Sequence, residues 1–178
     1  MTLKIYGVAA SRAIRPLWAA EELGIPYEHI PVHYQDTAAL NAPAFRALNP
    51  NGTVPAIDDH GLVLFESLAI TLHLARTRPE GGLWAASAAG PSQILQWTLW
   101  AATEIEPLAR QVAERLREQI MNQSIEIDGH SLTVTVSSGS QDDLGVFATW
   151  LCSCAAVRVS HFSGRAPKRF SKAMENLM

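Results

Sequence analysis

Residues 48–70, which read LNPNGTVPAIDDHGLVLFESLAI, decide the fold of the N-terminal part of this chain. They open with a turn signal at residues 49–52, because proline presets φ while asparagine and glycine tolerate positive φ. Residues 54–57 predict a short strand, with Pro55 at its start or edge because proline cannot donate to a ladder. Residues 62–65 predict a second strand, and the Asp/Gly turn between the two strands predicts a hairpin.

The end of this stretch predicts a helix whose N-terminus suits a carboxylate. Ser67 precedes the apolar pattern and fits the N-cap or first turn of that helix, where N–H groups and the positive end of the dipole are exposed. Glu66 is placed to accept a hydrogen bond from a ligand ammonium group. An edge at Val54 would leave its backbone N–H and C=O to pair with an extended peptide. Taken singly, each feature also has a purely structural interpretation as a cap or a turn.

Composition limits the class of protein. The chain has 178 residues, enough for one or two domains, with 48% hydrophobic and 17% charged residues, typical of a soluble globular protein. A net charge of −3 and a pI near 6.0 argue against nucleic-acid or membrane-surface partners. No apolar run of transmembrane length and no leader pattern is present, so we expect no membrane span and a cytoplasmic location. Cys152 and Cys154 fit neither a disulfide framework nor a zinc knuckle, and no metal is expected.

The first 80 residues alternate between strand and helix. The predicted order is a strand at 3–6, a helix at 11–23, a strand at 27–32, an irregular stretch at 33–42, a short helix at 43–48, the hairpin, and a helix at 67–76. Gly24 and Pro26 mark the end of the first helix. This β-α-β-α-β-β-α order predicts one mixed sheet with helices on both faces and a right-handed crossover between its parallel strands.

Two motifs carry a family resemblance. The segment KIYGVAASRAIRPLWAAEELGIPYE at residues 4–28, followed by residues 48–70, resembles the thioredoxin-like N-terminal domain of cytosolic glutathione S-transferases, in particular the serine-type, phi-like members. The resemblance implies a thioredoxin-like domain over residues 1–79 with glutathione as co-substrate. It also implies a cis bond before Pro55, backbone pairing of the glutathione cysteinyl with Val54, and γ-glutamyl contacts from Glu66 and Ser67.

Ser11 is the candidate catalytic residue. A thiol with a pKa of about 8.5 is mostly protonated at neutral pH, and the thiolate is the nucleophile. A hydroxyl that donates to the sulfur at a helix N-terminus would favour the anion. The pattern KIYGxxxS places Ser11 at such a junction, although the same position also suits a helix cap. Arg12 and Arg15 would either steer an anionic substrate or, as we expect, form a solvated helix face.

The chain departs from its relatives at the glycyl end of the site. Related serine-type enzymes often carry His or Lys near positions 40 and 41, whereas this chain has Leu40 and Asn41. Only Asn41 offers a polar contact there. Thr53 stands where Gln or Lys is common. The predicted glutathione-binding residues are Asn41, Thr53, Val54, Pro55, Glu66 and Ser67.

The C-terminal half is predicted in three parts. Residues 80–90 form a linker, and residues 91–120 form helix, with Pro107 expected to kink or break it because proline removes a helical hydrogen bond. The segment SQILQWTLWAATEIEPLARQVAERL resembles the first helix of the family's all-helical C-terminal domain, which implies a homodimer through this helix and residues 67–77. Residues 121–178 are an atypical tail that leaves this domain incomplete. In it, residues 124–136 predict a hairpin around Asp128-Gly129, residues 137–143 a flexible stretch, and residues 158–172 a basic segment.

Two functional interpretations remain open. The first is a glutathione transferase in which Ser11 stabilises the thiolate for attack on a small electrophile, as in detoxification. The second is a non-catalytic thioredoxin-like module that binds glutathione or a protein, or a truncated inactive product. The sequence does not name the electrophile, and it does not separate conjugation from peroxidase, isomerase or dehalogenase chemistry.

Overall fold

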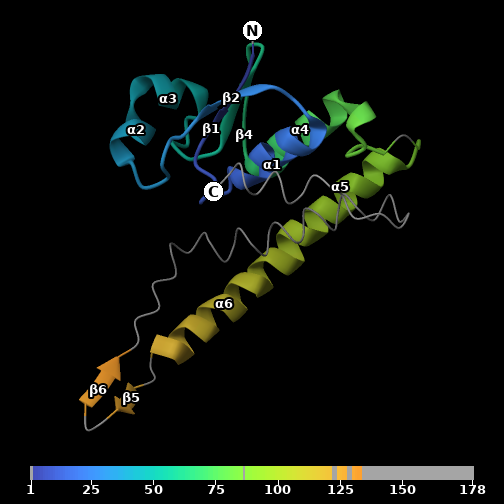
Figure 1. The fold of residues 1–178 in the computed structure, drawn as a ribbon. Coiled ribbons are helices and arrows are strands. Elements are labelled where there is room, and N and C mark those ends of the chain that lie inside the picture. Colours follow the sequence, from blue (N-terminus) through green and yellow to red (C-terminus); the bar gives the residue numbers. More distant parts are fainter. Residues whose placement is uncertain (1, 86, 122–123, 128–129, 134–178) are drawn as a thin grey trace.

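The computed structural model describes residues 2–85, 87–121, 124–127 and 130–133. Figure 1 shows an N-terminal α/β unit from which a long helical arm extends, with a small hairpin at its far end. The strands of the α/β unit are β1 (Leu3–Tyr6), β2 (Tyr27–Ile30), β3 (Ala56–Asp59) and β4 (Leu62–Phe65). This arrangement confirms the expected thioredoxin-like domain followed by helical structure.

The four strands form one mixed sheet in the order β2-β1-β3-β4. The first two strands are parallel, with Leu3 opposite Tyr27. Strand β3 runs antiparallel to both β1 and β4. Parallel strands need a crossover connection, which α1 (Ile14–Leu23) supplies between β1 and β2. The predicted mixed sheet and its hairpin are therefore confirmed.

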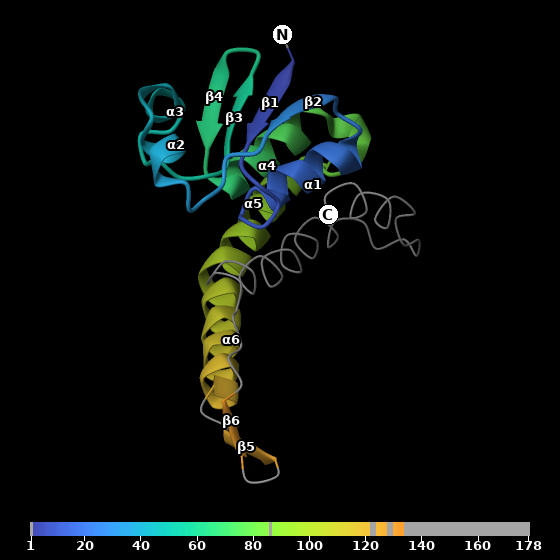
Figure 2. The same ribbon diagram turned by 60° about the vertical axis from the view of Figure 1, so that its left-hand side comes forward.

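Helices cover both faces of this sheet. Figure 2 shows α1 and α4 (Ser67–Thr77) on one side of the strands, and α2 (Thr37–Asn41) and α3 (Pro43–Leu48) on the other. The core lies between the sheet and the α1–α4 layer. Its fully buried apolar side chains include Ile5, Leu17, Ile57, Ile70 and Leu74. Burial of such side chains contributes about 1.5–3 kcal/mol each, so this layer stabilises the strand ends from which the site is built.

Several predicted boundaries differ from the structure. The helix expected from Ser11 begins at Ile14, because Ser11 takes part in a turn in which its hydroxyl bonds neighbouring backbone groups. The strand expected over 27–32 ends at Ile30, before Pro31, which has no N–H to donate. The strand expected over 54–57 begins at Ala56.

The stretch expected to be irregular over 33–42 contains a short helix, α2. The Asp36 side chain accepts a hydrogen bond from the Ala39 N–H at 2.9 Å and so caps this helix. An Asp cap of this kind satisfies a donor that the first helical turn leaves unpaired. The prediction failed here because a five-residue helix shows too little apolar periodicity in the sequence to be recognised.

The helical arm begins after a short 3₁₀ turn, Pro79–Gly81. It consists of α5 (Gly90–Trp100), a π-helical turn (Ala101–Ile105) and α6 (Glu106–Met121). The π turn ends two residues before Pro107, and this confirms that the regular α-helix is interrupted near the proline. Proline lacks the N–H that would continue the hydrogen-bond ladder, and a π turn accommodates the lost bond. Among the residues that the structure describes, no helix is both long enough and apolar enough to span a membrane.

The predicted hairpin in the C-terminal segment is confirmed in part. Strands β5 (Ser124–Ile127) and β6 (His130–Thr133) pair antiparallel, with Ile125 opposite Leu132. Residues 128–129 and 134–136 lie outside the described residues. The stretches expected to be flexible at 137–143 and basic at 158–172 lie outside them as well.

Candidate functional site

A cavity of about 340 Å³ lies where the loops at one end of the sheet meet the start of α4. Its lining residues are Ser11, Arg12, Tyr34, Leu40, Gly52, Thr53, Val54, Pro55, Glu66 and Ser67. Six of the seven predicted site residues line it. They come from three segments that the sheet topology brings together: the turn after β1, the stretch before β3, and the start of α4. The exception is Asn41.

Gly7, at the end of β1, allows two of these segments to approach each other. Its φ is +126°, and a Cβ atom built at this position would lie 2.7 Å from the Ala13 Cβ and 3.0 Å from the Val54 Cβ. Both distances are shorter than ordinary van der Waals contact. The glycine of the KIYG motif therefore lets the turn that carries Ser11 lie close to Val54.

Replacing Gly7 by alanine is expected to destabilise the fold by roughly 2 kcal/mol, because the new methyl group has no room and the backbone is in a glycine-favoured conformation. Chemical denaturation of the two proteins measures this difference. Gly61→Ala is the matched control, since Gly61 also has positive φ (+93°) but a Cβ there meets nothing within 4 Å. Equal losses in both variants would show that backbone conformation alone accounts for the effect.

The segment before β3 is held by its own turn and a cis peptide bond. The buried side chain of Asn49 donates to the Thr53 carbonyl at 2.7 Å and accepts from the Asn51 N–H at 3.0 Å. The Val54-Pro55 bond is cis, as expected. Because β-sheet pairing begins at Ala56, the peptide group of Val54 lies beyond the ladder, at the cavity wall. This is the position that an extended peptide would need for backbone pairing.

Ser11 is buried, with 3% of its surface exposed, and its hydroxyl is fixed by two local bonds. The oxygen accepts from the Ala13 N–H at 3.1 Å, and the hydroxyl donates to the Val8 carbonyl at 2.8 Å. The first bond holds the oxygen in place beside the start of α1. The second must open before the hydroxyl can donate to a ligand. A role in the turn and a role in the site are thus compatible at this residue.

Ser67 is the first residue of α4 and is also buried. Its hydroxyl oxygen accepts a hydrogen bond from the Arg15 guanidinium at 2.7 Å. Arginine is a donor only, so Ser67 must act as the acceptor in this bond. Its own proton can therefore be donated in another direction, such as toward a carboxylate in the cavity.

Arg15 connects this serine to the helical arm. It is 5% exposed and donates to Glu106 of α6 at 2.9 Å, while Arg12 donates to the other oxygen of the same carboxylate at 2.8 Å. The expectation that both arginines form a solvated face is wrong for Arg15. Glu106 is a residue that the sequence analysis missed. Its position between two arginines shows only in three dimensions, because 91 residues separate it from Arg15.

The ionisation of Glu106 follows from these partners. Burial alone would raise the pKa of this carboxyl, but the guanidinium groups of Arg15 and Arg12 outweigh burial and hold the pKa below its usual value. The carboxylate is therefore charged at neutral pH and neutralises part of the positive charge beside the cavity.

Glu66 and Asn41 differ in how they relate to the cavity. Glu66 is an exposed lining residue with a φ of +71°, a conformation that is uncommon for a residue other than glycine and tends to occur at functional sites. Asn41 is not among the lining residues: its amide donates to the Thr37 carbonyl at 2.8 Å and accepts from Arg46. Its expected contact with a glycyl carboxylate stays a prediction.

Tyr34, which the sequence analysis did not single out, lines the cavity from the loop after β2.

Comparison with known proteins shows which family the N-terminal part of the chain resembles. Residues 1–76 match the family model described as glutathione S-transferase, N-terminal domain. The chain is 44% identical over 80 residues to glutathione S-transferase 4 of Zea mays, covering 44% of this chain and 35% of that protein. It is 27% identical over 146 residues to glutathione S-transferase F13 of Arabidopsis thaliana, covering 82% of this chain and 65% of that protein.

A solved structure extends the similarity to the fold. The theta class glutathione S-transferase of Xanthomonas axonopodis pv. citri, solved with glutathione bound, is 27% identical, with a TM-score of 0.56. The alignment covers 89% of this chain and 68% of that one. The N-terminal part of this chain is therefore similar to the N-terminal domain of glutathione S-transferases. The chain spans between 35% and 65% of the length of the curated relatives named above.

Proposed function

We propose that this chain binds glutathione in the 340 Å³ cavity and activates its thiol for transfer to a small electrophile. The observation that carries the proposal is the convergence of Ser11, the Val54 peptide group and Ser67 on one cavity. They supply a hydroxyl beside a helix start, a backbone edge and a helix N-terminus, which are the groups that a thiol, an extended peptide and a carboxylate respectively require.

In the proposed binding mode, the cysteinyl backbone of glutathione pairs with Val54. The γ-glutamyl carboxylate accepts hydrogen bonds from the Ser67 hydroxyl and from the N–H groups at the start of α4, while its ammonium group lies against Glu66. Thr53 and Pro55 form the adjoining wall, and Asn41 is the residue predicted to contact the glycyl end. No metal takes part in this scheme.

In the proposed reaction, the glutathione thiol releases its proton to solvent, and the Ser11 hydroxyl turns from Val8 to donate a hydrogen bond to the sulfur anion. The sulfur lone pair then forms a carbon–sulfur bond with the electrophile, and the leaving group departs with the electron pair of the bond that breaks, as chloride does from a chlorinated aromatic. Holding both reactants in one site supplies a proximity contribution to the rate.

The assembly and setting of the protein belong to the same proposal. We expect a cytoplasmic homodimer that conjugates electrophiles in detoxification. Support for a dimer comes from the large apolar side chains exposed along the helical arm: Leu95, Trp97, Leu99, Trp100, Leu108, Val112 and Leu116. Apolar side chains gathered along an exposed helical surface are typical of interaction surfaces.

Replacing Ser67 by alanine is expected to weaken glutathione binding about tenfold, because one charge-assisted hydrogen bond to the carboxylate is lost. Titration calorimetry with glutathione measures the effect, and thermal unfolding checks that the variant is folded. Ser92→Ala, an exposed serine on α5, is the control and should bind as the wild type does. Failure of the wild-type protein to bind glutathione would overturn the proposed function.

A non-catalytic glutathione-binding module is the second candidate. The donation of the Ser11 hydroxyl to Val8 supports it, since that bond gives the residue a structural role that needs no reaction. This alternative predicts glutathione binding without turnover of any electrophile, and calorimetry together with a conjugation assay distinguishes it from the enzyme.

A further inference from the structure

A second cavity, of about 500 Å³, lies between the α/β unit and the helical arm. It shares Arg12, Glu66 and Ser67 with the first cavity, so the two adjoin. Its other lining residues are Arg15, Leu68, Ala102, Glu106, Pro107, Arg110 and Gln111. Because Arg12 directly follows Ser11, this cavity opens beside the position proposed for the glutathione sulfur.

The charges that line this second cavity are mostly positive. Three guanidinium groups, those of Arg12, Arg15 and Arg110, line it together with the carboxylates of Glu66 and Glu106. Glu106 forms ion pairs with all three arginines: Arg15 and Arg12 donate hydrogen bonds to it at 2.9 and 2.8 Å, whereas Arg110 lies 3.6 Å from it, an ion pair beyond hydrogen-bond distance. In the proposed function Glu66 holds the glutathione ammonium, which leaves a surplus of positive charge on the side of the cavity formed by α6.

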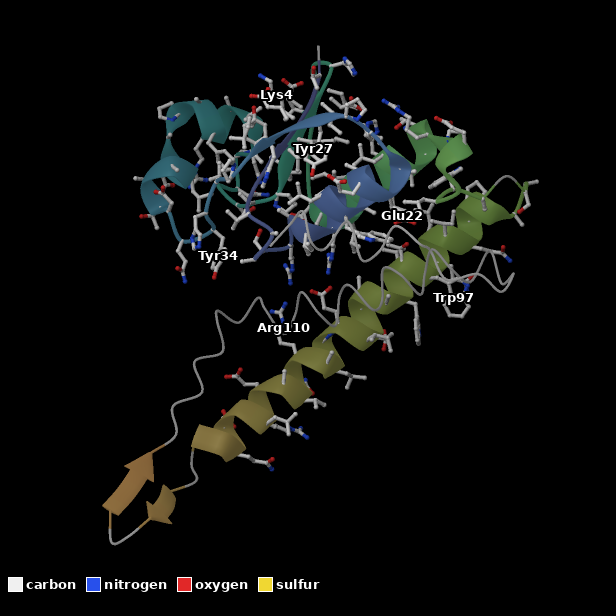
Figure 3. The ribbon with its side chains drawn as sticks, in the orientation of Figure 1. Lys4, Glu22, Tyr27, Tyr34, Trp97 and Arg110 are labelled. Atoms are coloured by element: carbon white, nitrogen blue, oxygen red, sulfur yellow. The ribbon has the colours of Figure 1, made fainter. Side chains whose placement is uncertain are left out.

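Of these three arginines, Arg110 is the one best placed to pair with an anionic group of a ligand. It is half-exposed, and Figure 3 shows its side chain on the side of α6 that faces the α/β unit. The neighbouring walls from Pro107, Ala102 and Leu68 supply apolar surface. A ligand with a flat apolar body and a carboxylate at its far end matches this combination, because guanidinium groups pair with carboxylates in a bidentate geometry.

We propose that the second cavity is the subsite for an electrophile that carries a carboxylate, and that Arg110, with Arg12, recognises this group. The inference rests on the proposed function, since the first cavity must hold glutathione for the second to receive its reaction partner. It narrows the substrate class from small electrophiles in general to anionic ones.

Binding of stable conjugates tests this without any turnover. The probes are S-benzylglutathione and S-(4-carboxybenzyl)glutathione, which differ only in the carboxylate, and calorimetry gives the ratio of their dissociation constants. We expect the wild type to prefer the carboxylated probe about fivefold, since a half-exposed ion pair is partly screened. The preference should disappear in Arg110→Gln and shrink as salt rises from about 0.05 M to about 0.5 M.

Arg115→Gln is the matched control, because Arg115 is an exposed arginine of α6 outside the cavity lining and its loss should leave the ratio at the wild-type value. Equal binding of both probes by the wild type would overturn the subsite while leaving the glutathione site standing. The subsite would also be overturned if Arg110→Gln weakened the binding of free glutathione as much as it weakened the binding of the carboxylated probe. In that case Arg110 would contact glutathione itself. Binding of neither probe would overturn the subsite and the proposed function together.

Discussion

Replacing Ser11 by alanine is expected to lower the rate of glutathione conjugation to a chlorinated aromatic roughly fiftyfold at pH 6.5. A thiol with a pKa near 8.5 is only about 1% ionised at that pH, whereas a hydrogen bond that lowers the pKa by about two units would make it about half ionised. Glutathione affinity should change little, because the backbone and carboxylate contacts remain. Initial rates at saturating glutathione measure the effect.

The pH dependence separates a catalytic Ser11 from a structural one. The loss should almost vanish near pH 9, where a thiol with a pKa near 8.5 is already about three-quarters ionised without help. Alanine also removes the bonds to Val8 and Ala13, so we expect a stability loss of about 1 kcal/mol. Thermal unfolding measures this loss. Ser92→Ala should keep the wild-type rate at both pH values. A loss of the same size at pH 6.5 and pH 9 would contradict thiolate stabilisation.

Replacing Glu106 by alanine is expected to destabilise the fold by about 3 kcal/mol, because it leaves the Arg15 guanidinium buried without its carboxylate. The side chain of Glu106 is 12% exposed and that of Arg15 is 4% exposed, so solvent compensates the loss poorly. Denaturant unfolding at pH 7 gives the difference. Glu118→Ala, on an exposed position of the same helix, should change stability little.

The effect of this substitution should depend on pH with a defined sign. The folded-state pKa of Glu106 is lowered, so its ion pairs stabilise the protein fully above the unfolded pKa of about 4.3 and lose this contribution as pH falls through the folded value. The stability gap between wild type and Glu106→Ala should therefore be constant from pH 7 to about pH 5 and narrow below about pH 4. A gap that widened in acid would contradict the ion-pair explanation.

Local signals in the sequence predicted most of the N-terminal fold. The Asp/Gly turn fixed the β3–β4 hairpin, and Gly24 with Pro26 fixed the end of α1, because these residues act through their own backbone preferences. Prediction failed where a side chain bonded nearby backbone groups instead. Ser11 delays the start of α1 in this way, and Asp36 caps a helix too short to show periodicity.

The candidate site was predictable to the extent that it uses backbone features. The cis bond at Pro55 and the helix start at Ser67 occur in motifs with a fixed order, and both were expected. Glu106 and Arg110 were not, because charges on an amphipathic helix such as α6 give no sign of which face meets another part of the chain. Only the three-dimensional structure distinguishes them from the charges around them, through the bonds of Glu106 to Arg12 and Arg15 and the position of Arg110 in the second cavity.

The link from Ser67 through Arg15 to Glu106 bears on how the chain can be divided. The predicted linker at residues 80–90 suggests itself as the end of an N-terminal fragment. A fragment that ends there, however, keeps the buried guanidinium of Arg15 and loses the Glu106 carboxylate that neutralises it. In energetic terms the N-terminal unit extends into the first turn of α6. Chimaeras and minimal glutathione-binding fragments made from this chain should therefore be joined beyond that turn, where both sides of the junction keep their own counter-charges.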